Sequence, residues 1–376
     1  MPTVWKRASC VHHCTERSMQ HHSRISGLAY EARKAPGGAY QHNIFHQSEH
    51  LYCMLSMAIM RNENPDVILW PYQSMPWTRA LASLVLPNTT WEETCCGPAN
   101  VAAKWWLGQR RVCSCWQKIC LQRRPAFWPG RRGSIAHARL RKIVRERCGL
   151  HLLGGGAEHH RGAVVRVLER PSRDGRQIEN REEFLRVVRG AVSGAHVEFA
   201  VTAVSERALP TWQDANRTRA GTLEDGRISS APFLCEQVRW FAGASIIVLT
   251  HGAQTTNAIF ADPGATVIDV TPYGHQPSPS APAEYYGALL QNTDINYITQ
   301  QASAHPRTPL STKAAQTLQK ADVAQSSERC RTQWACTVAF RDHCCMRLSQ
   351  QDLADLRLKL EVSLRSRRLH FKNVSL

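Results

Sequence analysis

The sequence predicts an α/β protein built around a parallel, doubly wound sheet. Short apolar runs rich in β-branched residues alternate with helical segments through the middle of the chain. The clearest run, Ser245 to Leu249, is apolar after its first residue, as in strands that are buried on both faces of a sheet. Strands separated by helices form βαβ units, and such units build parallel sheets.

The elements are expected in the following order. Strands are expected at 163–168, 195–201, 245–249 and 264–270. A helix is expected at 181–189, with Asn180 as its N-cap, Glu183 at the capping-box position, and Phe184, Leu185 and Val188 on its apolar face. A short helix is expected at 235–243. A third, at 350–364, repeats leucine at helical spacing, which predicts packing in a core or against a partner.

Composition excludes several classes of protein. With 43% hydrophobic and 20% charged residues, the chain is not wholly disordered, and 22 Gly and 19 Pro among 376 residues exclude a collagen-like chain. No apolar stretch reaches the roughly 18–20 residues of a membrane span. The start of the sequence shows no apolar signal core. The chain is therefore expected to have neither anchor nor signal peptide, and to form two domains or one large two-lobed unit.

The positive charge lies mostly outside the middle region. The whole chain carries a formal net charge of +17, but residues 161–310 hold 14 basic and 15 acidic side chains, whereas 101–150 hold 13 basic and one acidic. The basic segment also contains several tryptophans, and cations mixed with aromatic residues are typical of single-stranded nucleic-acid binding. Because its arginine pairs show neither a helical nor a strand period, we expect a solvated, poorly ordered or non-native insert there instead.

Cysteine is distributed like the charge. Thirteen of the 14 cysteines lie outside 161–310, and the exception is Cys235. Cys10 and Cys14, with two histidines between them, resemble half of a zinc site, but no second pair follows at a matching spacing. No metal site is therefore predicted. Disulfides in an oxidising compartment and unpaired thiols are the two alternatives for these cysteines.

The chemistry is expected where the strand at 245–249 ends. That strand brings His251, Gly252 and Ala253 to the carboxyl edge of the sheet, where open parallel sheets bind their ligands. The helix that follows opens with Gln254, Thr255, Thr256 and Asn257. The N–H groups and positive dipole end of such a helix attract a diphosphate, with the His251 side chain as an added donor.

This stretch resembles the signature of glycosyltransferase family 61. Ten positions fall in register with it: Glu236, Gln237, His251, Gly252, Ala253, Thr256, Asn257, Phe260, Pro263 and Gly264. Upstream, Arg170 to Leu185 resembles an arginine-containing element of the family, and Asn43 to Tyr52 resembles an element of its amino-terminal lobe. Three positions differ: Leu249 and Gln254 replace glycines, and Thr255 replaces leucine. The bulk of Gln254 is expected to crowd the diphosphate.

The resemblance implies a GT-B fold, with two Rossmann-like lobes and a UDP-sugar held mainly by the carboxyl-terminal lobe. It implies inverting transfer of N-acetylglucosamine, xylose or arabinose to a protein or polysaccharide hydroxyl, with no cofactor and no obligatory metal. The donor-binding residues it implies are His251, Gly252, Ala253, Thr255, Thr256, Asn257, Arg170 and Arg176. The catalytic base would be Glu49 or His46.

The resemblance also implies a compartment and a division of the chain. The family works in the endoplasmic reticulum or Golgi, usually behind an anchor that is not visible here, and sequons at Asn88, Asn216 and Asn373 are compatible with that lumen. The expected parts are an unassigned segment (1–35), a degenerate acceptor-side lobe (36–160) containing the basic insert (101–150), a nucleotide-sugar lobe (161–310) and a basic tail (311–376).

Two other functions are compatible with the sequence. The first is a catalytically inactive or degraded relative, because the insert at 101–150, a polar stretch at 203–231 and the tail do not resemble lobes of an enzyme, and the phosphate turn is altered. The second is a basic nucleic-acid-binding protein that uses the cations of 101–150. The near-neutral charge of the region that is expected to fold argues against this last function.

Overall fold

The structure is a computed structural model, and it describes part of the chain. The described residues are 29–32, 44–70, 74, 76–93, 110–113, 130–150, 163–170, 176–201, 231–273, 285–303, 312–322, 339 and 346–374. The polar stretch at 203–231 lies outside them except for its last residue, Ala231, which begins a helix. The chain divides into two compact units, Met1–Leu121 and Gln122–Leu376. The sequence analysis grouped 122–160 with the first lobe, whereas this division groups it with the second unit.

The first unit contains a four-stranded, wholly parallel sheet. Its strands are β1 (Ala29–Ala32), β2 (Val67–Trp70), β3 (Thr90–Glu93) and β4 (Arg110–Cys113), in the order β3-β2-β1-β4. The helices α1 (Ile44–Arg61) and α2 (Pro76–Val85) pack against each other. Their apolar faces bury Leu51, Met54, Trp77 and Leu81. The order 3-2-1-4 is the one in which a Rossmann fold begins.

Two features of the first unit were not expected from the sequence. Strand β1 lies within 1–35, a segment left unassigned, and its central place between β2 and β4 makes it integral to the sheet. The pair Arg110 and Arg111 opens β4, although no strand period was recognised in the basic segment. The pairing of β4 with β1 explains this, because a sheet edge accepts a short strand without an alternating pattern of its own.

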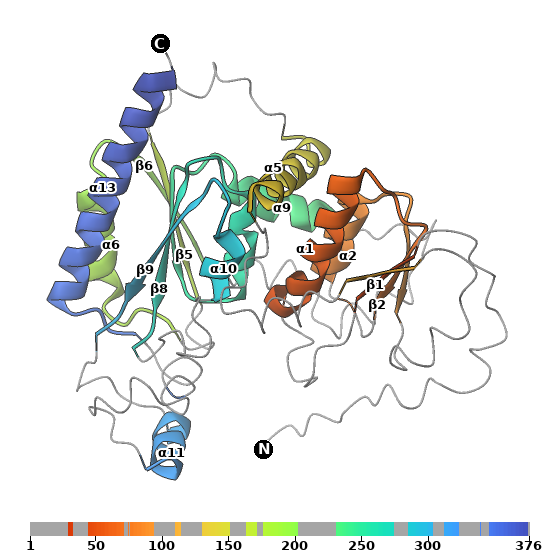
Figure 1. The fold of residues 1–376 in the computed structure, drawn as a ribbon. Coiled ribbons are helices and arrows are strands. Elements are labelled where there is room, and N and C mark those ends of the chain that lie inside the picture. The colour runs from red at the N-terminus through yellow and green to blue at the C-terminus, as the bar shows by residue number, and fades with distance from the viewer. Residues whose placement is uncertain are drawn as a thin grey trace. The chain divides into compact units, whose positions relative to one another are not determined.

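The second unit is built on a five-stranded parallel sheet (Figure 1). Its strands are β5 (Val164–Glu169), β6 (His196–Val201), β7 (Ile246–Thr250), β8 (Thr266–Thr271) and β9 (Asn296–Gln301), in the order β6-β5-β7-β8-β9. The four strands expected from the sequence are confirmed within two residues at each end. Strand order 2-1-3-4-5 is doubly wound, and its switch point lies between β5 and β7.

Helices cover both faces of this sheet. Figure 1 shows α6 (Arg181–Ala191) and α13 (Gln350–Val374) on one face, and α9 (Ala231–Phe241) and α10 (Tyr285–Leu290) on the other. The helices expected at 181–189 and 235–243 are confirmed, the second beginning four residues earlier than expected. A further helix, α11 (Thr312–Lys320), buries Ala314 and Leu318. Both faces of β7 and β8 are thereby closed to water, as their apolar composition predicts.

The capping box expected at the start of α6 is wrong. Asn180 is the N-cap, but its side chain makes no capping hydrogen bond. Its amide instead pairs with the backbone of Leu348, accepting from the Leu348 N–H at 3.0 Å and donating to the Leu348 carbonyl at 2.8 Å. A side-chain amide can replace a peptide group in this way, so Asn180 extends the bridge that joins Ile178 to Met346.

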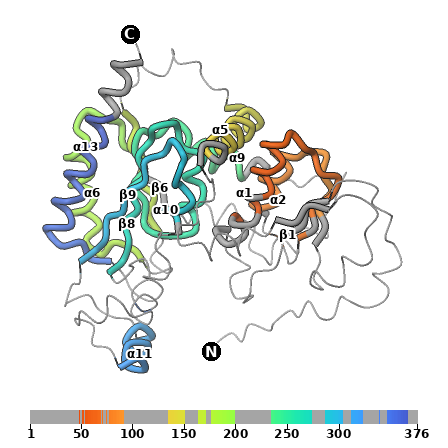
Figure 2. The backbone as a smooth tube through the Cα atoms, in the orientation of Figure 1, coloured from red at the N-terminus to blue at the C-terminus, as the bar shows by residue number. Residues whose placement is uncertain are grey.

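The expected helix at 350–364 is confirmed as core. Ser349 and Asp352 form a reciprocal capping box at its start, with distances of 3.1 and 2.8 Å. Leu353, Leu356, Leu360 and Leu364 are buried in the same apolar cluster as β5, β7 and α6. The backbone traces of α13 and α6 run side by side (Figure 2). This part of the predicted basic tail therefore belongs to the second unit.

The basic insert is corrected in its second half. Residues Gly130–Arg147 form helix α5, which packs against α9. Ala136, Leu140 and Val144 are buried at intervals of four, together with basic side chains on the same face. Charged residues are rarely buried, which is why the sequence pattern was interpreted as a solvated segment.

One disulfide links these two helices. Cys148, just after α5, is bonded to Cys235 in α9, 87 residues away. Of the alternatives left open for the cysteines, a disulfide is therefore the one found for this pair. Among the described helices, none is both long and apolar enough to span a bilayer.

The packing of α13 predicts unequal effects of two substitutions in one helix. Leu356 is 0% exposed, so Leu356→Ala is expected to destabilise the second unit by about 2–5 kcal/mol. Leu358 is 60% exposed, and Leu358→Ala is expected to change stability by less than about 0.5 kcal/mol. Thermal unfolding of the full chain, followed by circular dichroism, measures both. Equal melting temperatures for the two variants would show that α13 is not part of the core.

Candidate functional site

The candidate site lies at the carboxyl ends of β5 and β7. These strands are neighbours at the switch point of the sheet, where doubly wound proteins bind ligands. Arg170 follows β5 directly, and His251 follows β7. The fold therefore brings together two residues that are 81 positions apart in the sequence (251 minus 170).

His251 is held on three sides. Its backbone N–H donates to the Val270 carbonyl at 2.9 Å, and its Nδ1 lies 2.8 Å from Oδ2 of Asp269. The Tyr286 ring stands edge-on to the imidazole, with centroids 5.1 Å apart. His251 and Asp269 are 4% and 0% exposed. The Asp269 carboxylate can only accept, so Nδ1 carries a proton, and this carboxylate balances the charge whenever both nitrogens are protonated.

Asp269 has a second donor. The Tyr297 hydroxyl, from β9, donates to the same oxygen at 2.7 Å. Three neighbouring strands thus contribute to one hydrogen-bonded chain, from Tyr297 through Asp269 to His251. The orientation of the imidazole is fixed by the sheet rather than by a loop, which is the kind of support a functional side chain requires.

A short 3-10 helix, η5 (Ala253–Phe260), begins immediately after His251. Gly252 is its N-cap, in an extended conformation with φ 177°, and as a glycine it has no side chain that could cap the helix. A helix was expected here and is confirmed, although it is 3-10 rather than α. The first N–H groups of a helix point out of its start, so this end can receive an anion.

Two arginines lie against this turn. A Cβ added to Gly252 would stand 2.2 Å from Nη1 of Arg170, so the guanidinium occupies the space that glycine leaves open. Arg176 donates from Nη1 to the His251 carbonyl at 3.0 Å. Arg176 also has a φ of 59°, a left-handed conformation that residues other than glycine rarely adopt. The structure therefore groups Arg170, Arg176, His251 and Gly252, as expected from the sequence.

The other residues that are expected to bind the sugar donor are mostly buried. Thr255, Thr256 and Asn257 are 1%, 0% and 0% exposed, and Ala253 is half-buried. Among the described residues, the Thr255 hydroxyl is buried without a hydrogen-bond partner. Because such groups are normally paired, this hydroxyl is one that a ligand at the start of η5 can satisfy.

Asn257 links two helices. Its Nδ2 donates to Oε1 of Gln237 in α9 at 2.8 Å and to Oε1 of Gln254 at 2.9 Å. Both amide protons of Asn257 are used in these contacts, and the first contact holds η5 against α9. Gln254 reaches along η5 toward Asn257, and this hydrogen bond restrains the bulk that was expected to crowd a diphosphate.

The expected catalytic base stays a prediction. His46 and Glu49 lie in α1 of the first unit, and their side chains are outside the described part of the structure. Within the described ranges, no group of three His, Cys, Asp or Glu side chains could hold a metal ion.

Sequence reasoning missed Asp269, Tyr297 and Gln237 as members of the site. A signal for Asp269 was present, because it is the one acid in the otherwise uncharged strand Thr266–Thr271, and a buried acid needs a partner. Gln237 was matched to the family signature but given no role. Tyr297 can be assigned to the site only from the pairing of β9 with β8, which no local sequence pattern reveals.

The contact between Gly252 and Arg170 predicts a selective loss of ligand binding. Gly252→Ala leaves the backbone unstrained at φ 177° but displaces the Arg170 guanidinium. We expect the affinity for UDP to fall about tenfold or more, equivalent to about 1.4 kcal/mol, with little change in melting temperature. Gly190→Ala is the matched control, because a Cβ there meets nothing within 4 Å. Calorimetry on the full chain measures the affinity, and equal UDP binding by both variants contradicts the assignment.

Comparison with known proteins supports the assignment of this region. The family model described as glycosyltransferase 61 matches residues 229–268, which run from α9 through β7 and η5 into β8. The matched span contains Gln237, His251, Gly252 and Asn257 and ends one residue before Asp269. No curated protein matches the chain. The match covers the span that builds the site, so this region is similar to glycosyltransferase family 61, and the similarity supports a glycosyltransferase function.

Proposed function

We propose that the chain transfers a sugar from a UDP-sugar to a hydroxyl group of a protein or polysaccharide, with inversion at the anomeric carbon. The sugar would be N-acetylglucosamine, xylose or arabinose. The observation that carries the proposal is the cationic turn at the switch point, where Arg170 and Arg176 flank His251 and Gly252 at the start of η5. Such a turn suits a diphosphate, because guanidinium groups and helix N–H groups both donate to phosphate oxygens.

The proposed chemistry follows from the charge that develops on the leaving group. The acceptor oxygen attacks the anomeric carbon, the bond from that carbon to the diphosphate oxygen breaks, and UDP departs with the electron pair. Arg170, Arg176 and an imidazolium at His251, paired with Asp269, stabilise that charge where it develops. Because these side chains supply the cations, we propose that no metal ion is obligatory.

The proton of the acceptor hydroxyl needs a base. We propose His46 or Glu49, both in α1 of the first unit, as that base. This assignment requires a GT-B arrangement, in which the first unit binds the acceptor and the second binds the donor. The wholly parallel sheets of both units are compatible with two Rossmann-like lobes.

The two alternative functions, an inactive relative and a nucleic-acid-binding protein, lose part of their support. An inactive relative was suggested by the insert and the tail, but α5 and α13 pack in the second unit. A nucleic-acid-binding role was suggested by the cations of 101–150, but Arg141 and Arg145 are buried and ion-paired within that unit. These two side chains are therefore not available for phosphate contacts on a nucleic acid.

We also propose that the protein works in the lumen of the endoplasmic reticulum or Golgi. The disulfide between Cys148 and Cys235 is typical of an oxidising compartment. Asn88 begins the sequon Asn88-Thr89-Thr90 and lies exposed in the turn between α2 and β3. An exposed turn is accessible to the enzyme that attaches N-linked glycans.

Donor specificity and mechanism are tested by a transfer assay. The full chain is incubated with UDP-N-acetylglucosamine, UDP-xylose or UDP-arabinose and with secreted proteins or polysaccharide as acceptors, and UDP release is measured. We expect UDP release with one of the donors, at a rate that EDTA does not change, and an inverted linkage in the product by NMR. The rate of UDP release should fall by at least about 100-fold in His251→Ala. A folded chain that releases UDP from none of the donors would contradict the proposed activity and favour the inactive relative.

The compartment is tested at Asn88. When the chain is expressed in eukaryotic cells, we expect peptide N-glycosidase to increase its gel mobility, and Asn88→Gln to remove part of that shift. Asn64→Gln is the matched control, since Asn64 is exposed and lies outside any sequon. A wild-type chain that carries no glycan would contradict the proposed lumenal location.

A further inference from the structure

We propose that helix α5 positions the donor-binding end of η5, with His137, Arg141 and Arg145 as positioning residues for the transfer reaction. The proposal rests on the proposed function, because the ligand in question is the diphosphate of UDP. It gives a role in the site to a helix that ends 89 residues before Glu236, the first position that matches the family signature (236 minus 147).

The three side chains share one face of α5. They occur at intervals of four residues, which places them one above another on a helix. Their exposed fractions are 1%, 6% and 6%. Buried basic side chains on a helix are unusual and imply specific partners.

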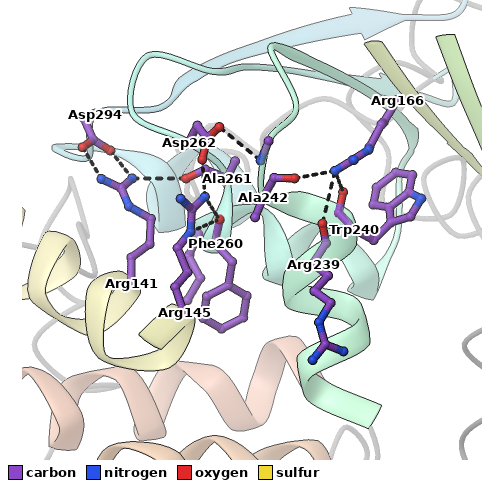
Figure 3. A network of polar contacts seen from close by, with 12 residues as sticks. Arg141, Arg145, Arg166, Arg239, Trp240, Ala242, Phe260, Ala261, Asp262 and Asp294 are labelled. Carbon is purple, nitrogen blue, oxygen red and sulfur yellow. Dashed lines mark hydrogen bonds and ion pairs between the residues drawn. The ribbon is translucent and has the colours of Figure 1, made fainter. Parts of the chain in front are cut away.

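Their partners are three consecutive carbonyl groups at the end of η5. His137 Nε2 donates to the Ile259 carbonyl at 2.9 Å. Arg145 Nη2 donates to the Phe260 carbonyl at 2.7 Å, and Arg141 Nη1 donates to the Ala261 carbonyl at 3.3 Å (Figure 3). The last carbonyl groups of a helix have no partner within it, and basic side chains near that end satisfy them.

Acidic residues balance the charge of these contacts. Arg141 makes two hydrogen bonds of 2.5 Å to Asp294, and Arg145 pairs with Asp262, whose other oxygen accepts from the Gly243 N–H at 3.1 Å. Burial raises the pKa of Asp294, but the hydrogen bonds and charge of Arg141 outweigh burial and leave that pKa below its ordinary value. The pair of Arg141 and Asp294 is thus held as ions.

His137 adds no charge at neutral pH. Burial, with the nearby charge of Arg141, lowers the pKa of His137 from 6.5 to about 4. Its Nε2 carries the proton, since a carbonyl can only accept. The face of α5 is therefore electrically balanced, and it acts on η5 through geometry rather than through a long-range positive field.

A second helix holds the same 3-10 helix, and the two are covalently joined. Helix α9 contacts η5 through Gln237 and Asn257. The disulfide between Cys148 and Cys235 connects α5 to α9, and Arg239 donates to the Cys148 carbonyl at 3.0 Å. Both supports of η5 are thereby fixed to each other as well as to η5.

This support matters because η5 is short. It has eight residues in a 3-10 conformation, whose hydrogen bonds have poorer geometry than those of an α-helix. Hydrogen bonds to a diphosphate require their donors to be placed within about 0.5 Å. A shift at the carbonyl end of so short an element moves its amino end, so loss of the α5 contacts is expected to weaken phosphate binding specifically.

The test compares UDP with uridine, which has the same base and ribose but no phosphate. In the full chain, Arg145→Met is expected to raise the Kd for UDP at least tenfold and to change the Kd for uridine less than twofold, by calorimetry and ligand-observed NMR. Arg145→Lys keeps a cation beside Asp262 but loses part of the contact with Phe260, so an intermediate loss is expected. Arg139→Met, on the exposed side of α5, should change neither affinity.

Three results would overturn the proposal. If UDP and uridine weaken together, α5 only stabilises the fold. If neither weakens in a folded Arg145→Met or Arg145→Lys variant, η5 does not depend on α5. If the wild-type chain binds no UDP, the proposed function is contradicted, and this inference with it. The wild-type measurement shows that outcome before any variant is measured.

Discussion

An eight-residue 3-10 helix cannot hold its own position, and much of the second unit is organised around this constraint. The end of β7 fixes where η5 begins, because the His251 N–H continues the pairing with β8. Helix α9 holds its middle through Asn257, and helix α5 holds its last carbonyl groups. With the carbonyl end fully engaged, the amino end can be directed at a ligand, which is the geometry that anion-binding helices share.

The cationic groups at that amino end are supported in the same manner. The sheet orients His251 through Asp269 and Tyr297, and Gly252 leaves space for the Arg170 guanidinium. The segment of Arg176 is held from the other side of the unit, since Gln177 and Glu179 pair with the backbone of Met346. The segment just before α13 therefore contributes indirectly to the position of Arg176. Regions far apart in the sequence, around 141, 176, 251 and 346, thus converge on one turn.

The sequence predicts the parts of this unit whose signal is local. Strands β5 to β8 are short runs rich in β-branched and apolar residues, and the amphipathic pattern of α6 and α13 is explicit in their leucine and valine spacing. The site itself was recognised through its resemblance to a family, because His251 and Gly252 alone are also compatible with an ordinary turn. Asp269 could have been suspected as an acid within a buried strand.

The rest depends on contacts that no local pattern encodes. Helix α5 was interpreted as a solvated insert because buried arginines contradict the usual distribution of charge. The carbonyl groups of η5, together with Asp262 and Asp294, explain their burial. Asn180 has the residue type and position of a capping side chain, yet it pairs with Leu348, 168 residues away.

The measurement that tests the central claim most directly is a crystal structure of the full chain with UDP. The account predicts the diphosphate at the start of η5, within hydrogen-bond distance of its first N–H groups and of Arg170, Arg176 or His251. A diphosphate bound elsewhere, with this turn empty, would contradict it.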